Sequence, residues 1–349
     1  MIEKHPLDKS QVRKTTLDNG LKAYLLSDPA FNKSAASMCV GVGSLQDPKT
    51  RQGLAHFLEH MLFLGTEKYP DVDEYSTYLR NNGGMSNAYT AADHTNYQFQ
   101  VFPDAFEGAL DRFAQFFIAP LFTAEYTDRE KNAVHSEYQK NKMNDNWREQ
   151  QIIFSFVRDG HPQQKFNIGN METLGDIKND ELLEFYNNEY SANRMSLAVL
   201  SNHSLDDMEK WYRKYFSMVP NHDLENVIYD HNVFERKKTF RLVNIEPVKD
   251  IRALEISFSL PGTRKYYRSK PGRILGYITG HEGKGSILSF LKRKNYATTL
   301  TTNIYQATNT YGFFSLRIDL TPKGLENHRN IIKTVLSYIK HSRNIEYPE

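Results

Sequence analysis

The sequence predicts an α+β protein built from two related domains. The chain has 349 residues, which is enough for two domains with sizeable hydrophobic cores. Segments typical of strands alternate with segments typical of helices in both halves, in a similar order. A polar, irregular stretch at residues 221–236 separates the halves and is the best linker candidate. We therefore place the domain boundary between residues 232 and 233.

Turn signals and hydrophobic spacing locate the elements of the first half. An Asp-Asn-Gly turn at 18–20 precedes the first predicted strand, and Gly83 and Gly84 end a predicted helix. Phenylalanine and leucine at helical spacing make 104–117 an amphipathic helix. Strands are predicted at 21–27, 34–42, 86–90, 96–101 and 195–200, and helices at 53–63, 73–82, 104–117, 128–143, 180–186 and 205–216.

The second half repeats this mixture of elements around a glycine-rich run. The run at 280–286 invites comparison with a phosphate-binding loop, but Gly285 separates Lys284 from Ser286, so the nucleotide interpretation is disfavoured. Ser286 is better explained as the N-cap of a helix. Strands are predicted at 240–243, 253–258, 300–305 and 313–318, and helices at 267–279, 286–293 and 325–341.

The stretch 53–63 combines a short apolar helix with three ionisable side chains. His56 and His60 are four residues apart, so a helix places them on one face, one turn apart. Two imidazoles in this arrangement can share a metal ion, and zinc is the usual one. Glu59 lies beside that face and could take a proton from a zinc-bound water. The order His-x-x-Glu-His inverts the common His-Glu-x-x-His zinc signature and occurs in peptidases.

Chance and ordinary packing are the alternatives to a metal site. The motif arises by chance in roughly a few per cent of chains of this length, and a lone histidine on an apolar helix is usually a core residue. Burying three unpaired ionisable groups among Leu, Phe and Met, however, costs free energy, and a metal would satisfy all three. The motif therefore favours a metal site.

A second helix, predicted at 128–143, offers carboxylates as further metal ligands. Glu130 and Glu137 are seven residues apart and share a face with alanine and valine. A zinc site needs a third protein ligand, which a glutamate on this helix can supply. A solvated charged face that includes Lys131 is equally compatible with the pattern. His135 points about 160° away from Glu137 around the helix and is excluded as a ligand.

Composition excludes several functional classes. The formal net charge is +2, from 44 basic and 42 acidic residues, which gives no argument for nucleic acid or an anionic membrane as partner. A single cysteine, Cys39, rules out an internal disulfide and a thiolate zinc cluster, and its apolar surroundings indicate a buried strand residue. No signal peptide or membrane-spanning run is visible, so we expect a soluble, cytoplasmic protein.

These motifs together resemble the insulin-degrading enzyme family, the insulysin and pitrilysin family of zinc metallopeptidases. That family combines His-x-x-Glu-His with a distal glutamate on a later helix, preceded seven residues earlier by another glutamate. The 77 positions from His60 to Glu137 fit the family spacing. The segments that carry the resemblance are 54–69, 107–117, 128–137 and 280–291.

The resemblance implies a role for each residue of the motif. His56, His60 and Glu137 would hold one Zn²⁺ per chain, and Glu59 would be the catalytic base. Glu130 would support the site as an outer partner of a metal ligand.

The resemblance also implies where a peptide substrate binds. Asn87 and Ala88 would lie on the edge strand that receives the peptide, as backbone hydrogen bonding to a free strand edge allows. Phe63 and Trp147 would line a pocket near the scissile bond. A distal site for the N-terminus of the substrate would include Gly280, Glu282 and Leu300.

The family architecture implies that this chain is half of a clamshell. Each of its two domains would be a mostly antiparallel sheet packed by helices. Residues 1–232 would form the catalytic zinc-peptidase domain and 233–349 a second, non-catalytic domain that is incomplete at its C-terminus. The opposite half would come from a longer polypeptide, from a separate C-terminal half or from another copy. Leu58, Tyr277 and Thr302 depart from the residues we expect of the family at these positions.

The sequence thus predicts a zinc-dependent endopeptidase that cleaves peptides or small proteins. The alternative is a non-catalytic or partner-dependent member of the same fold that acts as a peptide-binding half. Such relatives typically lose the zinc motif, whereas all four of its residues are present here.

Overall fold

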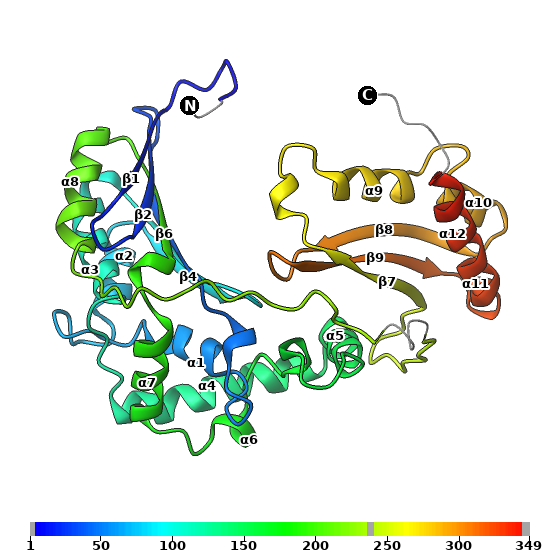
Figure 1. The fold of residues 1–349 in the computed structure, drawn as a ribbon, viewed down its shortest axis with the longest axis horizontal. Coiled ribbons are helices and arrows are strands. Elements are labelled where there is room, and N and C mark those ends of the chain that lie inside the picture. The colour runs from blue at the N-terminus through cyan, green and yellow to red at the C-terminus, as the bar shows by residue number, and fades with distance from the viewer. Residues whose placement is uncertain (1–3, 236–240, 344–349) are drawn as a thin grey trace. The chain divides into compact units, whose positions relative to one another are not determined.

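The computed structural model describes residues 4–235 and 241–343, and their contacts divide the chain into two compact units (Figure 1). The first unit combines the chain up to Lys142 with Lys165–Val227. The second combines Met143–Gln164 with the chain from Ile228 onward. The assignment of a catalytic domain to 1–232 and a non-catalytic domain to 233–349 stays a prediction, and the helical segment 143–164 belongs by its contacts to the second unit.

The first unit is built on a sheet of six strands in the order β1-β2-β6-β3-β5-β4. Only the β2–β6 pair is parallel, and the other neighbours are antiparallel. This arrangement confirms the predicted α+β class with a mostly antiparallel sheet. Its strands are β1 (Gln11–Thr16), β2 (Lys22–Ser27), β3 (Ser34–Val40), β4 (Met85–Thr90), β5 (Thr95–Val101) and β6 (Met195–Ser201).

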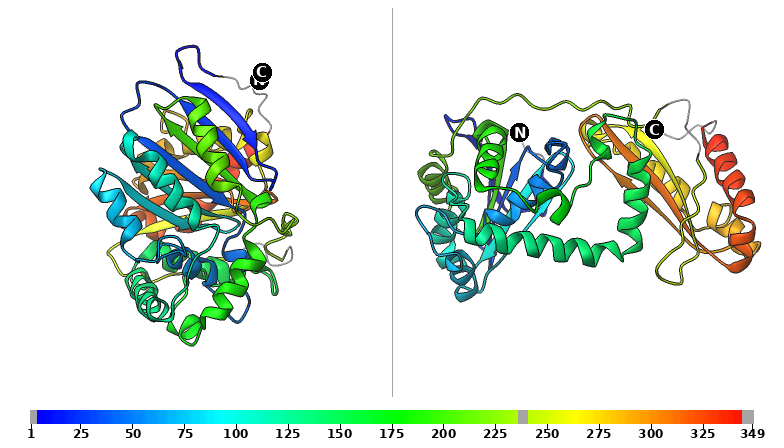
Figure 2. Two further views of the ribbon diagram at one scale, coloured as in Figure 1. Left: turned by 90° about the vertical axis from the view of Figure 1, so that its left-hand side faces the viewer. Right: turned by 90° about the horizontal axis from the view of Figure 1, so that it is seen from below.

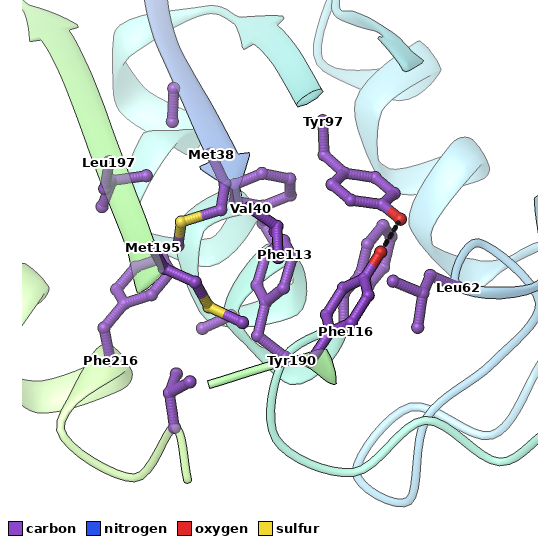
Figure 3. Close-up of a cluster of buried hydrophobic side chains, with 14 of the residues drawn as sticks. Met38, Val40, Leu62, Tyr97, Phe113, Phe116, Tyr190, Met195, Leu197 and Phe216 are labelled. Atoms are coloured by element: carbon purple, nitrogen blue, oxygen red, sulfur yellow. Dashed lines mark hydrogen bonds between the residues drawn. The ribbon is translucent and has the colours of Figure 1, made fainter. Parts of the chain in front are cut away.

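Helices cover one face of this sheet and enclose the core. Alternate residues of β3 are fully buried, as expected for a strand with one packed face. Figure 3 shows Met38, Met195 and Phe113 in this core, where the hydroxyls of Tyr97 and Tyr190 lie 2.7 Å apart. The helices are α1 (Leu54–Met61), α2 (Glu74–Asn81), α3 (Phe106–Gln115), α4 (Ala124–Lys142), α6 (Met171–Leu174), α7 (Asn179–Glu189) and α8 (Leu205–Phe216).

The second unit has a three-stranded antiparallel sheet in the order β7-β9-β8. Leu288, Leu316 and Ile331 are among the residues that form its separate core. Figures 1 and 2 show its helices packed on this sheet. Its elements are α5 (Asp145–Ser155), β7 (Ala253–Pro261), α9 (Pro271–Gly280), α10 (Ile287–Arg293), β8 (Ala297–Tyr305), β9 (Tyr311–Leu320), α11 (Pro322–Glu326) and α12 (His328–Ser342).

Four local predictions differ from the structure in existence or in extent, and β1, α5 and α6 were not predicted. Of the strand predicted at 240–243, residue 240 lies outside the described residues and 241–243 form no strand. Helix α9 begins at Pro271 rather than at residue 267, because Pro271 takes the first helical position after Lys270, which has a left-handed backbone. The last predicted helix is divided at Asn327 into α11 and α12. The helix predicted from residue 128 begins at Ala124.

The described part of the chain contains no helix that is both long enough and apolar enough to cross a membrane.

Candidate metal centre

The N-terminus of α1 is fixed by a close backbone contact and by one carboxylate. Gly53 has φ +89°, and a Cβ atom there would lie 2.3 Å from Gly169 Cα, so the position requires glycine. The carboxylate of Asp47 accepts hydrogen bonds from the N–H groups of Gly53 at 2.7 Å and Ala55 at 2.8 Å. These contacts satisfy free N–H groups of the first turn and fix the direction of α1.

Three side chains from α1 and α4 converge on one point. The two Nε2 atoms of His56 and His60 lie 3.2 Å apart. Glu137 Oε2 lies 3.6 Å from His56 Nε2 and 3.7 Å from His60 Nε2. Helix α4 is a single 19-residue helix that packs beside α1 (Figure 1). This packing brings Glu137 to the two histidines. Among the described residues these three form the one group with this potential to hold a metal.

The outer nitrogens of the two imidazoles are engaged in hydrogen bonds. His56 Nδ1 lies 2.7 Å from the carbonyl oxygen of Ile168, which can only accept, so Nδ1 carries the proton. His60 Nδ1 donates to Glu130 Oε1 at 2.9 Å. In the neutral imidazoles both Nε2 atoms therefore present lone pairs toward each other and toward a carboxylate oxygen.

Such a convergence of acceptors fits a cation. Four ligands placed about 2.0–2.1 Å from a tetrahedral zinc ion would be separated from one another by about 3.3–3.4 Å. The three observed separations of 3.2, 3.6 and 3.7 Å bracket this value. The donor set of two imidazoles and one carboxylate leaves a fourth position for water, as in catalytic zinc sites. The residues present therefore fit a metal ion.

Glu59 lies beside this centre on α1 and is 7% exposed. The hydroxyl of Thr90, at the end of β4, donates to Glu59 Oε2 at 2.6 Å. Burial raises the pKa of Glu59, and the hydrogen bond from Thr90 opposes this shift. A buried carboxylate with a raised pKa is suited to proton transfer.

The two histidines differ in their electrostatic surroundings. Burial and the neighbouring His60 lower the pKa of His56. Burial also acts to lower the pKa of His60, but the hydrogen bond to Glu130 and its negative charge reverse this effect, so the pKa is raised. Glu130 is 15% exposed and Glu137 39% exposed, so α4 does not present both carboxylates to solvent as a charged outer face would.

Two family models match the chain. The model described as Insulinase (Peptidase family M16) matches residues 22–165, and the model described as Peptidase M16 inactive domain matches residues 176–349. The chain belongs to the M16 insulinase family of peptidases. Both halves of the chain are accounted for by models of this family, and the predicted resemblance is confirmed.

Similar proteins extend well beyond the length of this M16 chain. It is 43% identical to an A-factor-processing enzyme of Saccharomyces cerevisiae and 44% identical to an insulin-degrading enzyme of Homo sapiens, each over 98% of this chain and 34% of the relative. A crystal structure of pitrilysin matches 99% of this chain and 38% of its own with a TM-score of 0.91 and 31% identity. The M16 chain thus spans about a third of the length of the curated relatives it matches.

The predicted peptide-binding strand of the M16 chain is an edge strand. Asn87 and Ala88 lie on β4, which pairs only with β5 among the described strands. Thr90 on the same strand contacts Glu59, so the free edge and the metal centre are adjacent. Phe63, just after α1, is half-buried and packs its ring against Phe116 at 5.2 Å between centroids. Its predicted role in a substrate pocket stays a prediction.

The other predicted substrate residues belong to the second unit. Gly280 and Leu300 line a groove of about 610 Å³ between α9 and β8, while Glu282 is exposed just beyond it. Trp147 lies on α5 and is 36% exposed. Their roles in substrate binding stay predictions.

Contacts around the centre that involve backbone groups or distant positions were not predicted. Asp47, Lys165 and the carbonyl of Ile168 support α1 from outside the motif. Lys165 Nζ donates to the carbonyls of Leu45 and Asp47 at 2.8 and 2.5 Å. No sequence pattern marks a carbonyl as a partner. Thr90, however, is two residues after Ala88 on a predicted strand, so the sequence could have shown that both side chains lie on the same face.

Proposed function

We propose that this M16 chain carries the active site of a zinc-dependent endopeptidase. The observation that supports this most strongly is the convergence of His56 Nε2, His60 Nε2 and Glu137 Oε2 within 3.7 Å of one another. Their donor types and spacing suit one zinc ion per chain. We assign these three residues as the zinc ligands and Glu130 as the partner that orients His60.

Catalysis would divide between the metal and the residues of α1. Zinc, when bound, supplies a Lewis acid that lowers the pKa of water and polarises a carbonyl. Glu59 takes a proton and passes it to the leaving amine. Since the Thr90 hydroxyl occupies Oε2, we assign the proton transfer to Oε1. The Nδ1–H of His56 donates to the carbonyl of Ile168, and the Nδ1–H of His60 donates to Glu130. These hydrogen bonds hold both rings in an orientation that leaves Nε2 free to bind a metal.

The substrate would be an extended peptide bound to the free edge of β4. Main-chain hydrogen bonds to a strand edge give affinity with little dependence on sequence. Asn87 and Ala88 lie on this strand two to three residues before Thr90, which contacts the base. A peptide that extends β4 would therefore pass close to Glu59. We place Phe63 and Trp147 near the scissile bond on the family resemblance alone.

Peptidase activity would require a further part of an M16 enzyme in addition to this chain. The relatives are about three times as long, so another half is expected to face the metal centre. That half would be a C-terminal continuation, a separate partner or a second copy. It would complete the enclosure around the peptide and restrict water.

The test is a Glu59→Gln variant compared with the unmodified chain. Glutamine keeps the size and the hydrogen bond from Thr90 but cannot act as a base. We expect unchanged zinc content and loss of cleavage of a fluorogenic peptide, measured with the complementary half present. Cleavage by the variant near the original rate would reject Glu59 as the base. Peptide binding with no cleavage by the unmodified protein would instead favour the non-catalytic, peptide-binding alternative.

A further inference from the structure

Residues 165–169 form an irregular segment that lies against the metal centre. The segment belongs to no helix or strand, so its position depends on hydrogen bonds made outside any regular ladder. The carbonyl of Ile168 accepts the Nδ1 proton of His56 at 2.7 Å, and the backbone of Gly169 lies against that of Gly53 at the start of α1. The segment therefore contacts the metal-binding helix at two points, and one of them is a proposed zinc ligand.

The same segment also contacts α4, the second helix of the metal centre. The ring of Phe166 packs edge-on against that of Tyr138, with 5.4 Å between their centroids. Tyr138 directly follows the proposed ligand Glu137 on α4. The backbone N–H of Phe166 donates to Oε1 of Gln52, just before α1, at 2.7 Å. The segment is thus connected to both helices that supply the proposed ligands.

Lys165 fixes the beginning of this segment to the loop before α1. Its Nζ donates to the carbonyls of Leu45 and Asp47 at 2.8 and 2.5 Å. Neither carbonyl accepts a backbone hydrogen bond in the described part of the chain, and Pro48, three residues after Leu45, has no N–H to offer. An ammonium group carries three donors and can satisfy both carbonyls at once.

These contacts connect Lys165 to His56 by two routes. The first passes through Asp47, whose backbone is held by Lys165 and whose carboxylate holds N–H groups of the first turn of α1. The second passes along the segment to the carbonyl of Ile168. The far end of the segment is also fixed, because Asn170 Oδ1 accepts hydrogen bonds from two N–H groups of α6 at 2.8 and 3.1 Å.

We propose that Lys165 is a positioning residue of the metal centre. By anchoring residues 165–169, it holds the carbonyl of Ile168 where His56 keeps its proton on Nδ1 and presents Nε2 to the metal. The hydrogen bonds of Lys165 go to backbone carbonyls, so it acts through His56 and not on the reacting atoms. This inference rests on the proposed function, in which His56 is a zinc ligand.

The test measures zinc affinity by competition against a chromophoric chelator. Lys165→Met keeps the length of the side chain and removes its donors. We expect this variant to bind zinc about three- to tenfold more weakly, because Lys165 acts one step further from the metal than the outer partners whose loss costs roughly 10–100-fold. Unchanged zinc affinity in Lys165→Met would overturn the proposal.

Lys33→Met is the matched control. Lys33 Nζ also donates to a backbone carbonyl of the first unit, that of Gly83, which precedes β4, whereas Thr90 beside the metal centre ends this strand. This variant therefore loses the same kind of contact away from the metal, and it should bind zinc like the unmodified chain. The same loss of affinity in both lysine variants would show a general effect of destabilisation and would overturn the proposal.

A second variant decides the question if Lys165→Met does not fold. Gln52→Met removes the acceptor of the Phe166 N–H and leaves Lys165 in place. It should also weaken zinc binding, since the segment is then held by fewer contacts. Zinc affinity equal to that of the unmodified chain would show that fixing the segment does not support the centre, and the proposal would be wrong.

A measurement without metal separates positioning from simple stabilisation of the fold. Long-range proton–nitrogen correlation spectra of the zinc-free chain, isotope-labelled at histidine and recorded above the pKa of histidine, distinguish the Nδ1–H and Nε2–H forms of an imidazole. The signal of His56 is assigned by its loss in His56→Gln. We expect the Nδ1–H form in the unmodified chain and a mixture of both forms in Lys165→Met. The Nδ1–H form alone in this variant would refute the proposal, whatever the variant does to thermal stability.

The proposed peptidase function and this inference can fail separately. A chain in which Lys165→Met loses zinc affinity and the pure Nδ1–H form of His56, but which cleaves no peptide even with its complementary half, leaves this inference standing. Cleavage by the unmodified protein together with unchanged zinc affinity in Lys165→Met refutes the inference and leaves the peptidase function in place.

Discussion

Replacing Glu130 by glutamine measures how strongly α4 orients the metal-binding histidines. Glu130 Oε1 accepts the Nδ1 proton of His60 at 2.9 Å, and its side chain is 15% exposed. Glutamine keeps the size of the side chain and an oxygen that can accept the same hydrogen bond. The substitution therefore removes the negative charge and little else, so its effect reports on electrostatic support of the His60 ring.

The expected magnitude follows from that single contact. A hydrogen bond to a charged group contributes about 1.5–3 kcal/mol and a neutral one about 0.5–1.5 kcal/mol. The difference of about 1–1.5 kcal/mol corresponds to zinc binding that is weaker by about tenfold. This lies at the lower end of the roughly 10–100-fold effects seen when outer partners of metal ligands are removed.

Competition for zinc against a chromophoric chelator gives the dissociation constant directly. Glu125→Gln is the matched control, because Glu125 is an exposed glutamate on the same helix and undergoes the same chemical change. Both variants should fold with similar thermal stability. Equal zinc affinity in the two variants would refute the idea that the charge of Glu130 supports the centre.

Three further predictions concern activity, pH and packing. This chain alone should cleave a fluorogenic peptide with a kcat/KM on the order of a hundredfold below that of a version extended by a C-terminal half, since positioning by the opposite half is lost; equal values would contradict this. Burial lowers the pKa of His161 despite its hydrogen bond to the carbonyl of Asp230. As pH falls below about 6.5, this histidine therefore gains a proton in the unfolded chain before it does so in the folded chain. The second unit should lose stability over this range, because the unfolded state binds more protons. Urea unfolding followed by Trp147 fluorescence in a W211F background should show this loss, and His161→Gln should reduce it. Gly53→Ala should lower the free energy of unfolding of the first unit by about 2–4 kcal/mol, because it adds both backbone strain and a steric clash. Gly160→Ala, in the second unit, should cost less, because Gly160 has φ +80° and open space around it, so only the backbone strain remains.

The strands and helices with clear hydrophobic periodicity were predicted well, because the buried positions recur with the period of the strand or helix. Strand β3 alternates buried and half-buried residues, and α3 carries phenylalanines at helical spacing. Strand β1 was missed because it is a polar edge strand with no buried residue. The strand predicted at 240–243 is not formed over its described residues, which are exposed and have no partner strand. Local pattern cannot report whether a neighbouring strand exists.

The part of the metal centre that lies on one helix could be predicted from local pattern, and the part that depends on packing between helices could not. The i, i+4 spacing of His56 and His60 is a local property of one helix and survives folding. Glu137 could not be distinguished from a solvated face by pattern, because its approach depends on how α4 packs beside α1. The carbonyl of Ile168 is more remote still, 112 residues away from His56 in sequence. The family resemblance supplied Glu137 and Glu130 where periodicity alone did not.

Zinc analysis of the purified chain tests the assignment of the centre most directly. The unmodified chain, loaded with zinc and dialysed, should retain one zinc per molecule. His60→Ala should retain none, while His135→Ala, which changes a half-buried histidine on α4 outside the proposed ligand set, should retain the full amount. Full zinc content in the His60→Ala variant would contradict the proposal that His56, His60 and Glu137 hold the metal.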